Sequence, residues 1–229
     1  MVKILILCGG FGSRFNKGKP GPLKPLIKIN KKTILEKIMA KYKKISNPTF
    51  ILLGGYKFNQ LKTFVKSLKN KYNVIAVNTG IKTNTAGRIL KVKKYLENEK
   101  NFFLTYGDSI ASYNPLIALK KNKIKDESII CLHKYKVPYG VVGIRNKKII
   151  KFSEKDYSVT VNAGYYLLSR KILNYIRSFD QSFEKDIVPY LIKNNIINFD
   201  YMILKKWYPI DNKYDLEKFK NLKQGKHEN

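Results

Sequence analysis

The sequence has few of the residues on which covalent catalysis and structural metal sites usually rest. Its 229 residues include two cysteines, two histidines and one tryptophan. Cys8 and Cys131 both fall inside apolar, strand-like runs, which excludes a disulfide framework and a zinc site. His133 falls in a predicted strand and His227 in the carboxyl-terminal tail. The chemistry that we expect here therefore does not depend on a histidine or a cysteine.

Long apolar runs are also missing, because no stretch approaches the length that spans a bilayer. The first residues lead directly into a strand-like run without the pattern of a signal peptide. A hydrophobic content of 44% with 13% aromatic residues is typical of a packed globular protein. We expect a cytoplasmic protein without a membrane partner, built as a single domain over residues 1–229.

Acidic residues are scarce, with 16 against 46 basic ones and a formal charge of +30. Such a surface attracts nucleic acid through the release of counterions. However, 41 of the basic residues are lysines that occur in every segment, which indicates a compositional bias rather than a nucleic-acid footprint. Nucleic acid is therefore not the expected partner. Two of the five arginines, Arg14 and Arg88, fall in glycine-containing motifs, where a bidentate phosphate contact would resist replacement by lysine.

A glycine-rich loop follows the first apolar run, Val2–Leu7. Glycines at positions 9, 10 and 12 allow backbone N–H groups to surround an anion without interference from Cβ atoms. Arg14 and Lys24 add positive charge beside this loop, Arg14 as a planar fork and Lys24 as a point charge. The stretch predicts a site for a phosphate chain. A strand-to-helix turn without a chemical role is the structural alternative.

Two common phosphate-binding loops do not fit this stretch. A dinucleotide-binding fingerprint needs a third glycine where Phe15 stands, and an acidic residue where Gly54 and Gly55 follow the second strand. A P-loop needs Gly-Lys followed by Ser or Thr, which is absent.

The chain order predicts an α/β fold. Apolar strands at 50–53, 74–77 and 102–105 alternate with helices at 33–44 and 58–68, and Thr33 with Glu36 forms a capping box. This order favours a Rossmann-like, mixed but mainly parallel sheet flanked by helices, with functional loops at the carboxyl ends of its strands. The second half is predicted to contain strands at 128–132, 140–144, 149–152 and 161–168 and a helix at 213–222. A short strand is also predicted at 26–29.

Two further stretches lie at predicted strand ends. Residues 78–88 are small and polar and lead into a helix near Ala86, so they can contact a base edge or phosphate oxygens. Asp108 follows the strand at 102–105 and is placed to hold a divalent cation on a nucleotide. The structural alternatives are a capped loop for residues 78–88 and an ordinary turn residue for Asp108.

Together these motifs resemble the sugar-phosphate nucleotidyltransferases, and among them the glucose-1-phosphate cytidylyltransferases. The glycine loop with Lys24-Pro25 is similar to the family signature. Thr79-Gly80, Thr85-Ala86-Gly87-Arg88 and Leu104-Thr105-Tyr106-Gly107-Asp108 are similar to Thr-Gly, Thr-Gly-Gly-Arg and Thr-Tyr-Gly-Asp-Gly of that group. The resemblance extends from Val2 to about Glu217 and implies the nucleotide-diphospho-sugar transferase (GT-A-like) fold. It divides the domain into a nucleotide-binding half, residues 1–125, and an acceptor-binding half, residues 126–229.

The resemblance implies a role for each matching residue. Arg14, Lys24 and Asp108 would be catalytic, and Asp108 and Asp211 would hold Mg²⁺; Asp211 lies in Trp207-Tyr-Pro-Ile-Asp211, similar to Trp-x-Pro-Met-Asp. The nucleotide would contact Leu7, Gly9, Gly10, Gly12, Ser13, Arg14, Lys24, Thr79, Thr85, Arg88 and Gly107. The acceptor would contact Tyr139, Gly140, Glu154, Lys155 and Asn162. Relatives with this fold usually assemble, so the resemblance also implies a homo-oligomer.

The expected reaction transfers CMP from CTP to a phosphorylated acceptor, such as glucose 1-phosphate, with release of pyrophosphate. Departures from the family pattern, such as Asp156 in place of a proline, cluster near the acceptor side. A non-sugar acceptor (a phosphorylated amino acid, a phosphonate or phosphocholine) and another nucleoside triphosphate stay open. A nucleotide-binding module without turnover and a nucleic-acid-binding protein are the alternatives from other classes.

Overall fold

The structure is a computed structural model that describes residues 2–125, 127–154 and 157–224. Its central sheet has seven strands in the spatial order β12 (Phe199–Ile203), β8 (Ser128–Lys136), β11 (Ser158–Ser169), β6 (Asn101–Tyr106), β1 (Lys3–Leu7), β4 (Thr49–Gly54) and β5 (Asn73–Asn78). Among these described strands, β11 alone runs antiparallel to its neighbours, β6 and β8. The predicted mixed, mainly parallel sheet is confirmed.

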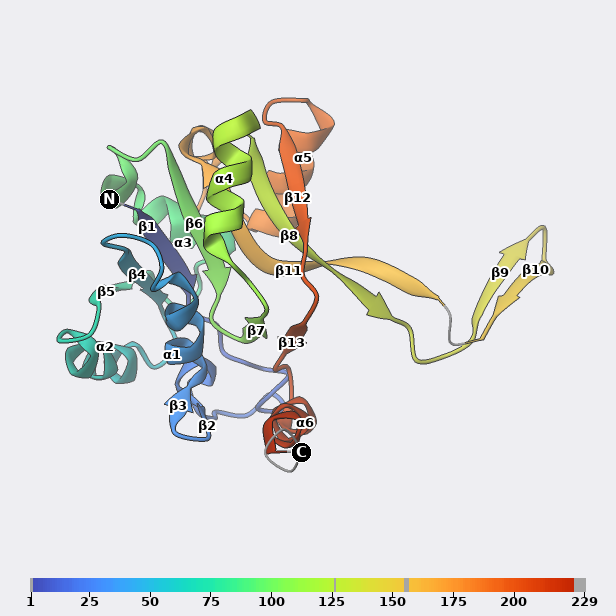
Figure 1. Ribbon diagram of the computed structural model, residues 1–229, viewed down its shortest axis with the longest axis horizontal. Coiled ribbons are helices and arrows are strands. Elements are labelled where there is room, and N and C mark those ends of the chain that lie inside the picture. Colours follow the sequence, from blue (N-terminus) through green and yellow to red (C-terminus); the bar gives the residue numbers. More distant parts are fainter. Residues whose placement is uncertain (1, 126, 155–156, 225–229) are drawn as a thin grey trace.

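Helices cover both faces of this sheet (Figure 1). Successive side chains of a strand point to opposite faces, so Ile4 and Ile6 of β1 join one buried cluster and Leu5 joins the other. The first cluster includes residues of α1 (Ile34–Met39), α2 (Phe58–Leu68), α4 (Pro115–Lys125) and α6 (Lys213–Gln224). The second includes residues of α3 (Thr85–Lys91) and α5 (Val188–Lys193). Burial on both faces explains why β1 and β4 are apolar after their first residues, Lys3 and Thr49.

Several predicted elements are confirmed and others differ. Helix α2 has the predicted bounds, and Thr33 and Glu36 form the predicted capping box at α1. The helix predicted at 33–44 is shorter, because after Met39 the chain tightens into a 3₁₀ turn at Ala40–Tyr42. The strand predicted at 26–29 is also shorter: Lys24–Leu26 is a 3₁₀ turn and only β2 (Lys28–Ile29) pairs, with β3 (Lys32–Thr33).

Other elements lie in stretches for which no prediction was made. These are the pair β7 (Ser109–Ala111) and β13 (Trp207–Pro209), helices α4 and α5, and strand β12. The chain also forms 3₁₀ turns at Lys93–Leu96 and Arg170–Tyr175 and a π-helical turn at Phe183–Ile187. No described helix is both long enough and apolar enough to cross a bilayer.

A slender extension leaves the body where β8 and β11 run past the other strands. Their ladder continues to the pair Lys136 and Ser158, and the hairpin β9 (Val141–Arg145) and β10 (Lys148–Ser153) lies beyond it. Figure 1 shows this hairpin projecting from the side of the molecule, far from the helices. We call residues 134–154 and 157–160 the arm.

The capping box gives the first prediction. The Thr33 hydroxyl accepts a hydrogen bond from the backbone N–H of Glu36, and the Glu36 carboxylate accepts one from the backbone N–H of Thr33. Thr33→Ala removes one partner and should lower the free energy of unfolding by about 1 kcal/mol, measured by urea denaturation. Glu36→Gln keeps an acceptor at the same position and is the control. An equal loss in both variants would contradict the prediction.

Candidate active site

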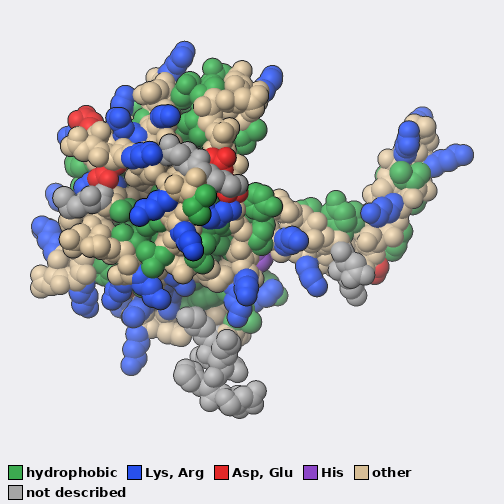
Figure 2. Space-filling view, turned by 45° about the horizontal axis from the view of Figure 1, so that its top comes forward, with side chains coloured by type: hydrophobic (Ala, Val, Ile, Leu, Met, Phe, Trp, Pro, Cys, Tyr) green, Lys and Arg blue, Asp and Glu red, His purple; other side chains and the backbone are tan. Residues whose placement is uncertain are grey.

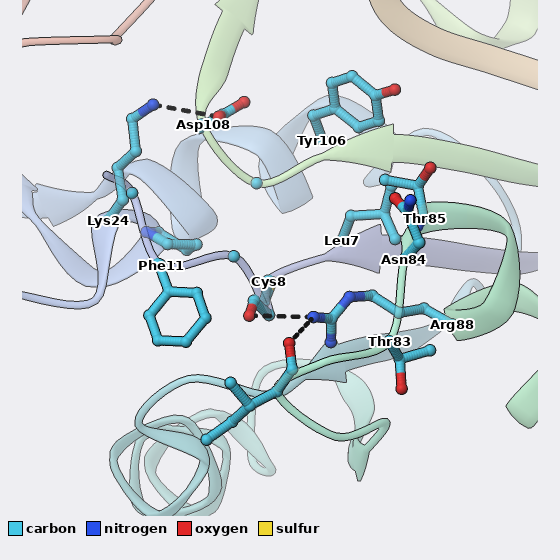
Figure 3. A pocket seen from close by; sticks show the side chains of 16 residues that line it. Leu7, Cys8, Phe11, Lys24, Thr83, Asn84, Thr85, Arg88, Tyr106 and Asp108 are labelled. Carbon is cyan, nitrogen blue, oxygen red and sulfur yellow. Dashed lines mark hydrogen bonds and ion pairs between the residues drawn. The ribbon is translucent and has the colours of Figure 1, made fainter. Parts of the chain in front are cut away.

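The predicted nucleotide site forms a cavity at the carboxyl ends of β1 and β6. Its volume is about 400 Å³. It lies between the glycine loop, the turn after β6 and the start of α3 (Figure 3). Nine of the residues predicted to contact the nucleotide or the metal line it: Leu7, Gly9, Gly10, Gly12, Lys24, Thr85, Arg88, Gly107 and Asp108.

The register of the sheet brings the glycine loop and Asp108 together. Strands β1 and β6 are parallel neighbours with Leu7 opposite Tyr106, and the N–H of Gly107 donates to the Leu7 carbonyl at 3.0 Å. A Cβ atom on Gly107 would lie 2.8 Å from that carbonyl oxygen, so only glycine allows the two strand ends to approach so closely. Asp108, the next residue, therefore emerges beside the loop.

The two predicted metal ligands meet at one cation. The Lys24 ammonium lies 3.1 Å from Asp108 Oδ2 and 3.2 Å from Asp211 Oδ1. Lys24 is only 8% exposed, whereas the two carboxylates are 40% and 31% exposed. The carboxylates therefore face the opening while Lys24 lies behind them. Figure 3 shows the Lys24–Asp108 contact at one end of the cavity.

The short β7–β13 pair positions Asp211. Pro209 lies opposite Ser109 in this antiparallel pair, and the N–H of Ile210 donates to the Asp108 carbonyl at 3.0 Å. The chain at Asp211 is thereby fixed beside Asp108. The Asp215 carboxylate also accepts a hydrogen bond from the Asp211 N–H at 2.9 Å, which stabilises the turn into α6.

Paired carboxylates suit a magnesium ion that is shared with a substrate. Among the described residues, no group of three Asp, Glu, His or Cys side chains is placed to hold a metal ion, and Asp108 and Asp211 are the two carboxylates that meet at Lys24. Mg²⁺ commonly takes one or two carboxylates and completes its shell with water and substrate phosphates. Asp108 and Asp211 converge on one cationic nitrogen, so the pair fits this mode.

Arg14 lies on the outer side of Asp211. Its guanidinium donates to Asp211 Oδ2 at 2.9 Å while the side chain stays 81% exposed. Arg14 and Asp211 line a second cavity of about 660 Å³, which also includes Tyr135, Val161 and Trp207. Ser13 is exposed and lines neither of the two cavities described here. The basic and acidic groups thus alternate from Arg14 through Asp211 and Lys24 to Asp108.

Arg88 has a different role from the predicted phosphate contact. Its side chain is almost fully buried, and its two terminal nitrogens donate to the carbonyls of Gly9, Gly54 and Ile81 and to the Thr79 hydroxyl. These four bonds occupy every N–H of the two terminal nitrogens. Burial also lowers the pKa of Arg88 from its ordinary value. Arg88 therefore ties together the loops that follow β1, β4 and β5.

The contacts of Arg88 explain two glycines. A Cβ atom on Gly9 would lie 2.0 Å from Nη1 of Arg88, and one on Gly55 would lie 2.7 Å from the same atom. The guanidinium consequently needs both positions to lack a side chain.

Thr79 and Thr85, which were expected to contact the base or ribose, form hydrogen bonds within the protein. Thr79 is fully buried, and its hydroxyl donates to the Gly54 carbonyl at 2.5 Å. The Thr85 hydroxyl lines the first cavity but donates to Glu184 at 2.7 Å. Thr79 lies behind the cavity wall, so its side chain does not frame the base as predicted.

Glu184 is a residue that the sequence reasoning missed. Its carboxylate accepts hydrogen bonds from the hydroxyls of Thr85, Tyr106 and Ser182. Burial raises the pKa of Glu184, while the Thr85 hydroxyl opposes this shift. Glu184 lies in the short segment between two apolar residues, Phe183 and Ile187. An acidic residue in such a segment is the signal that could have drawn attention to it. Phe11 and Ile81, which line the cavity and are about half exposed, were also missed.

The predicted acceptor residues are divided between the body and the arm. Asn162 lies on β11, bonded to Tyr166. Tyr139, Gly140 and Glu154 lie on the arm, outside the residues that line the two cavities. Lys155 lies outside the described residues. Because the arm projects away from the body (Figure 1), the arm residues lie apart from the nucleotide cavity within one chain. Their role in acceptor binding stays a prediction.

The mainly parallel sheet, the glycine loop and the paired carboxylates define an α/β nucleotide-binding protein. A family model described as nucleotidyl transferase matches residues 3–222. The chain belongs to this family, and the family predicted from the motifs is confirmed.

Individual relatives agree on the family and differ in the nucleotide that they name. The chain is 32% identical over 198 residues to "Probable glucose-1-phosphate cytidylyltransferase" of Bacillus subtilis, covering 76% of this chain and 78% of the relative. It is 32% identical over 184 residues to D-glycero-alpha-D-manno-heptose 1-phosphate guanylyltransferase of Campylobacter jejuni, covering 76% and 78%. The solved inositol-1-phosphate CTP transferase of T. maritima has the same fold, with a TM-score of 0.68, 18% identity and coverage of 97% and 94%.

The Arg88 contacts give the second prediction. Arg88→Lys keeps the charge but cannot reach three carbonyls and a hydroxyl at once. Unsatisfied buried acceptors should lower the free energy of unfolding by roughly 2–3 kcal/mol, measured by urea denaturation. Arg170→Lys, at an exposed position, is the matched control and should leave stability unchanged. An Arg88→Lys variant as stable as this control would refute the structural role.

Proposed function

We propose that the protein transfers a nucleotidyl group from a nucleoside triphosphate to a phosphorylated acceptor. The donor is CTP and the acceptor a sugar 1-phosphate such as glucose 1-phosphate. The observation that carries the proposal is the meeting of Asp108 and Asp211 at Lys24, beside the glycine loop. The CTP assignment rests on the Bacillus subtilis relative by its name and on the motifs, whereas the Campylobacter jejuni relative names a guanylyl group.

In the proposed reaction, an oxygen of the acceptor phosphate attacks the α-phosphorus of the triphosphate. A new P–O bond forms there while the bond from the α-phosphorus to the β-bridging oxygen breaks, and pyrophosphate leaves. Such a transfer needs positioning and charge neutralisation rather than a protein nucleophile. The backbone N–H groups of the glycine loop would hold the phosphates, and Lys24 would neutralise the charge that develops at the transferring group.

The charged residues around Asp211 would hold the metal ion and the departing phosphates. Asp108 and Asp211 would hold Mg²⁺, which when bound adds positive charge to the triphosphate and acts as a Lewis acid. Arg14 would bind the departing phosphates through its planar fork. Its side chain is exposed and its guanidinium pairs with Asp211 at the surface, so it can turn toward a triphosphate at little cost.

The apolar part of the cavity would take the base and ribose. Phe11 and Ile81 are large apolar residues at its rim, about half exposed, and a bound base would cover them. The Phe11 ring packs on Tyr56 with centroids 5.2 Å apart. The Tyr56 hydroxyl forms hydrogen bonds with the backbone of Gly21, so the same pair of aromatic rings would contact the base and hold the long loop before Lys24.

The cytoplasmic location stays a prediction.

A substrate screen gives the third prediction and tests the function directly. Four nucleoside triphosphates are combined with a panel of sugar 1-phosphates, phosphocholine, a phosphonate and a phosphorylated amino acid, and pyrophosphate release is measured by a coupled assay. We expect release only when CTP, a sugar 1-phosphate and Mg²⁺ are present together. Release with no donor–acceptor pair would refute the enzyme, and release with a non-sugar acceptor alone would correct the substrate class.

The fourth prediction concerns the carboxylate pair. Asp108→Asn removes one charge of the proposed ion site and should lower kcat by roughly a hundredfold or more, with an unchanged unfolding transition because the Asp108 side chain is partly exposed and asparagine has the same shape. Asp180→Asn, at an exposed position outside the lining of both cavities, is the control. Wild-type turnover in the Asp108→Asn variant would show that this carboxylate holds no catalytic cation.

The fifth prediction concerns the guanidinium. Arg14→Lys keeps the charge but loses the planar fork, so kcat/KM for the triphosphate should fall about tenfold. Arg177→Lys, outside both cavities, should match the wild-type protein. If both substitutions were equally harmless in the pyrophosphate assay, Arg14 would have no contact with the phosphates.

A further inference from the structure

The wall of the first cavity beside α3 is organised by one carboxylate, that of Glu184. Its Oε1 accepts a hydrogen bond from the Tyr106 hydroxyl. Its Oε2 accepts from the hydroxyls of Thr85 at 2.7 Å and Ser182 at 3.1 Å. Thr85 and Tyr106 line the cavity, whereas Ser182 is buried outside this lining. Glu184 therefore holds two cavity-lining hydroxyls from the protein side.

The hydrogens of these two hydroxyls are directed at Glu184. A hydroxyl has one hydrogen and two lone pairs, and an ionised carboxylate can only accept. Thr85 Oγ1 also accepts a hydrogen bond from the Phe183 N–H at 2.8 Å, which leaves it one lone pair and no hydrogen for a ligand. The phenol oxygen of Tyr106 likewise has lone pairs but no hydrogen to offer. Toward the cavity, both side chains are therefore hydrogen-bond acceptors.

The Tyr106 ring is held in place by several neighbours. A Cβ atom on Gly164 would lie 2.6 Å from Cδ2 of Tyr106, so the ring lies directly on the backbone of β11. Tyr166 packs edge-on against this ring with centroids 6.3 Å apart, and Phe183 packs on Tyr166 at 5.5 Å. The position of the phenol oxygen is therefore fixed before a ligand binds.

The chain that precedes this carboxylate also fixes the backbone on either side of Thr85. The N–H of Asn84 donates to the Phe179 carbonyl at 2.9 Å. The N–H of Ala86 donates to the Gln181 carbonyl at 3.1 Å. These two backbone donors are used within the protein as well, so they do not replace the missing hydrogen of the Thr85 hydroxyl.

The cationic groups of the cavity lie elsewhere or are already bonded. The Lys24 ammonium pairs with Asp108 at one end, and Figure 3 shows Tyr106 and Thr85 toward the opposite end. Arg88 also lines the cavity, but the N–H groups of its terminal nitrogens donate to protein oxygens. Phosphate oxygens are therefore attracted to the end with Lys24, and an uncharged part of the substrate is left for the other end.

A carboxylate at this place is an exception in a basic chain. The sequence has 16 acidic residues against 46 basic ones. Figure 2 shows basic side chains over most of the visible surface and acidic ones at a few places. A negative charge close to a triphosphate site lowers the affinity for phosphate, so Glu184 contributes to discrimination rather than to general attraction.

We propose that Glu184 makes this wall select an N–H or O–H group of the bound substrate. The oxygens of Tyr106 and Thr85 would accept from such a group, whereas a substrate carbonyl at the same place would meet only lone pairs. Glu184 is thus a positioning residue that acts through Tyr106 and Thr85. The proposal rests on the proposed function for the identity of the substrates. The selected donor is the amino group of the base, a ribose hydroxyl or a hydroxyl of the acceptor, which share this chemistry.

Three series of substrates distinguish these sources. CTP is compared with UTP for the base, and with 2′-deoxy-CTP and 3′-deoxy-CTP for the ribose. Glucose 1-phosphate is compared with its monodeoxy analogues for the acceptor. The ratio of kcat/KM between the member with the donor and the member without it is measured by pyrophosphate release. We expect the wild-type ratio to be at least about tenfold in one series.

Glu184→Gln should lower that ratio about tenfold and leave the other two series unchanged. The glutamine amide donates as well as accepts, so the Tyr106 or Thr85 hydroxyl can turn its hydrogen toward the substrate. A purely structural role would reduce kcat/KM equally for both members of every pair and leave all ratios as they are. Glu97→Gln, at an exposed position outside the lining of both cavities, is the matched control and should keep the wild-type ratios.

Tyr106→Phe and Thr85→Val test the same wall without changing the carboxylate. Each removes one of the two accepting oxygens, and at least one of them should lower the ratio of the same series. A wild-type protein without a preference in any series would overturn the proposal. Unchanged ratios in a folded Glu184→Gln variant would overturn it too. If that variant does not fold, unchanged ratios in both Tyr106→Phe and Thr85→Val would do so.

Binding measurements separate this proposal from the proposed function. The Kd values of the same compounds are determined with Mg²⁺ by isothermal titration calorimetry on the wild type and on Glu184→Gln. If no substrate pair releases pyrophosphate but a Kd ratio falls in Glu184→Gln, the proposed function fails and the selection stands. If pyrophosphate is released and no ratio differs between the two proteins, the function stands and the selection fails. Compounds that neither react nor bind would overturn both.

Discussion

The structure depends on one ammonium group held between two carboxylates that are distant in sequence. Lys24 lies in a short 3₁₀ turn, Asp108 follows β6, and Asp211 follows β13. Each comes from a segment that the sheet or the β7–β13 pair fixes at one place. An almost buried cation with partly exposed anions around it suits the proposed magnesium–triphosphate complex, because the carboxylates would face the metal ion and the ammonium would lie behind them.

Around this centre, buried polar contacts hold the loops in position. Arg88 joins the ends of three strands through carbonyl oxygens, and Glu184 gathers three hydroxyls at the start of α3. In a chain where basic positions are almost all lysine, an arginine at position 88 is explained by geometry. A lysine has no second nitrogen with which to reach two loops at once. The phosphate loop is therefore shaped by the protein before any ligand binds.

Periodicity and turn chemistry predicted most of the sheet and α2, because strand ends and caps are encoded locally. The sequence also predicted nine of the residues that line the first cavity, since a parallel sheet places the carboxyl ends of its strands together. It could not predict that the side chains of Arg88 and Thr79 form their hydrogen bonds within the protein, because their partners come together only in the folded chain. Asp211 was found by resemblance, but its position depends on β7–β13, a three-residue pair without a sequence signal of its own.

The two halves of the domain are held in position in different ways. The walls of the nucleotide cavity are fixed by buried contacts, such as those of Arg88 with the loops that follow β1, β4 and β5. Gly140 and Glu154, which the resemblance assigns to the acceptor, lie on the arm, and the arm projects away from that cavity. A two-stranded ribbon is only marginally stable by itself in water, so the position of the arm depends on the β8–β11 ladder that joins it to the central sheet. The half that would hold the triphosphate is therefore fixed by burial, and the half that would hold the acceptor mainly by strand pairing.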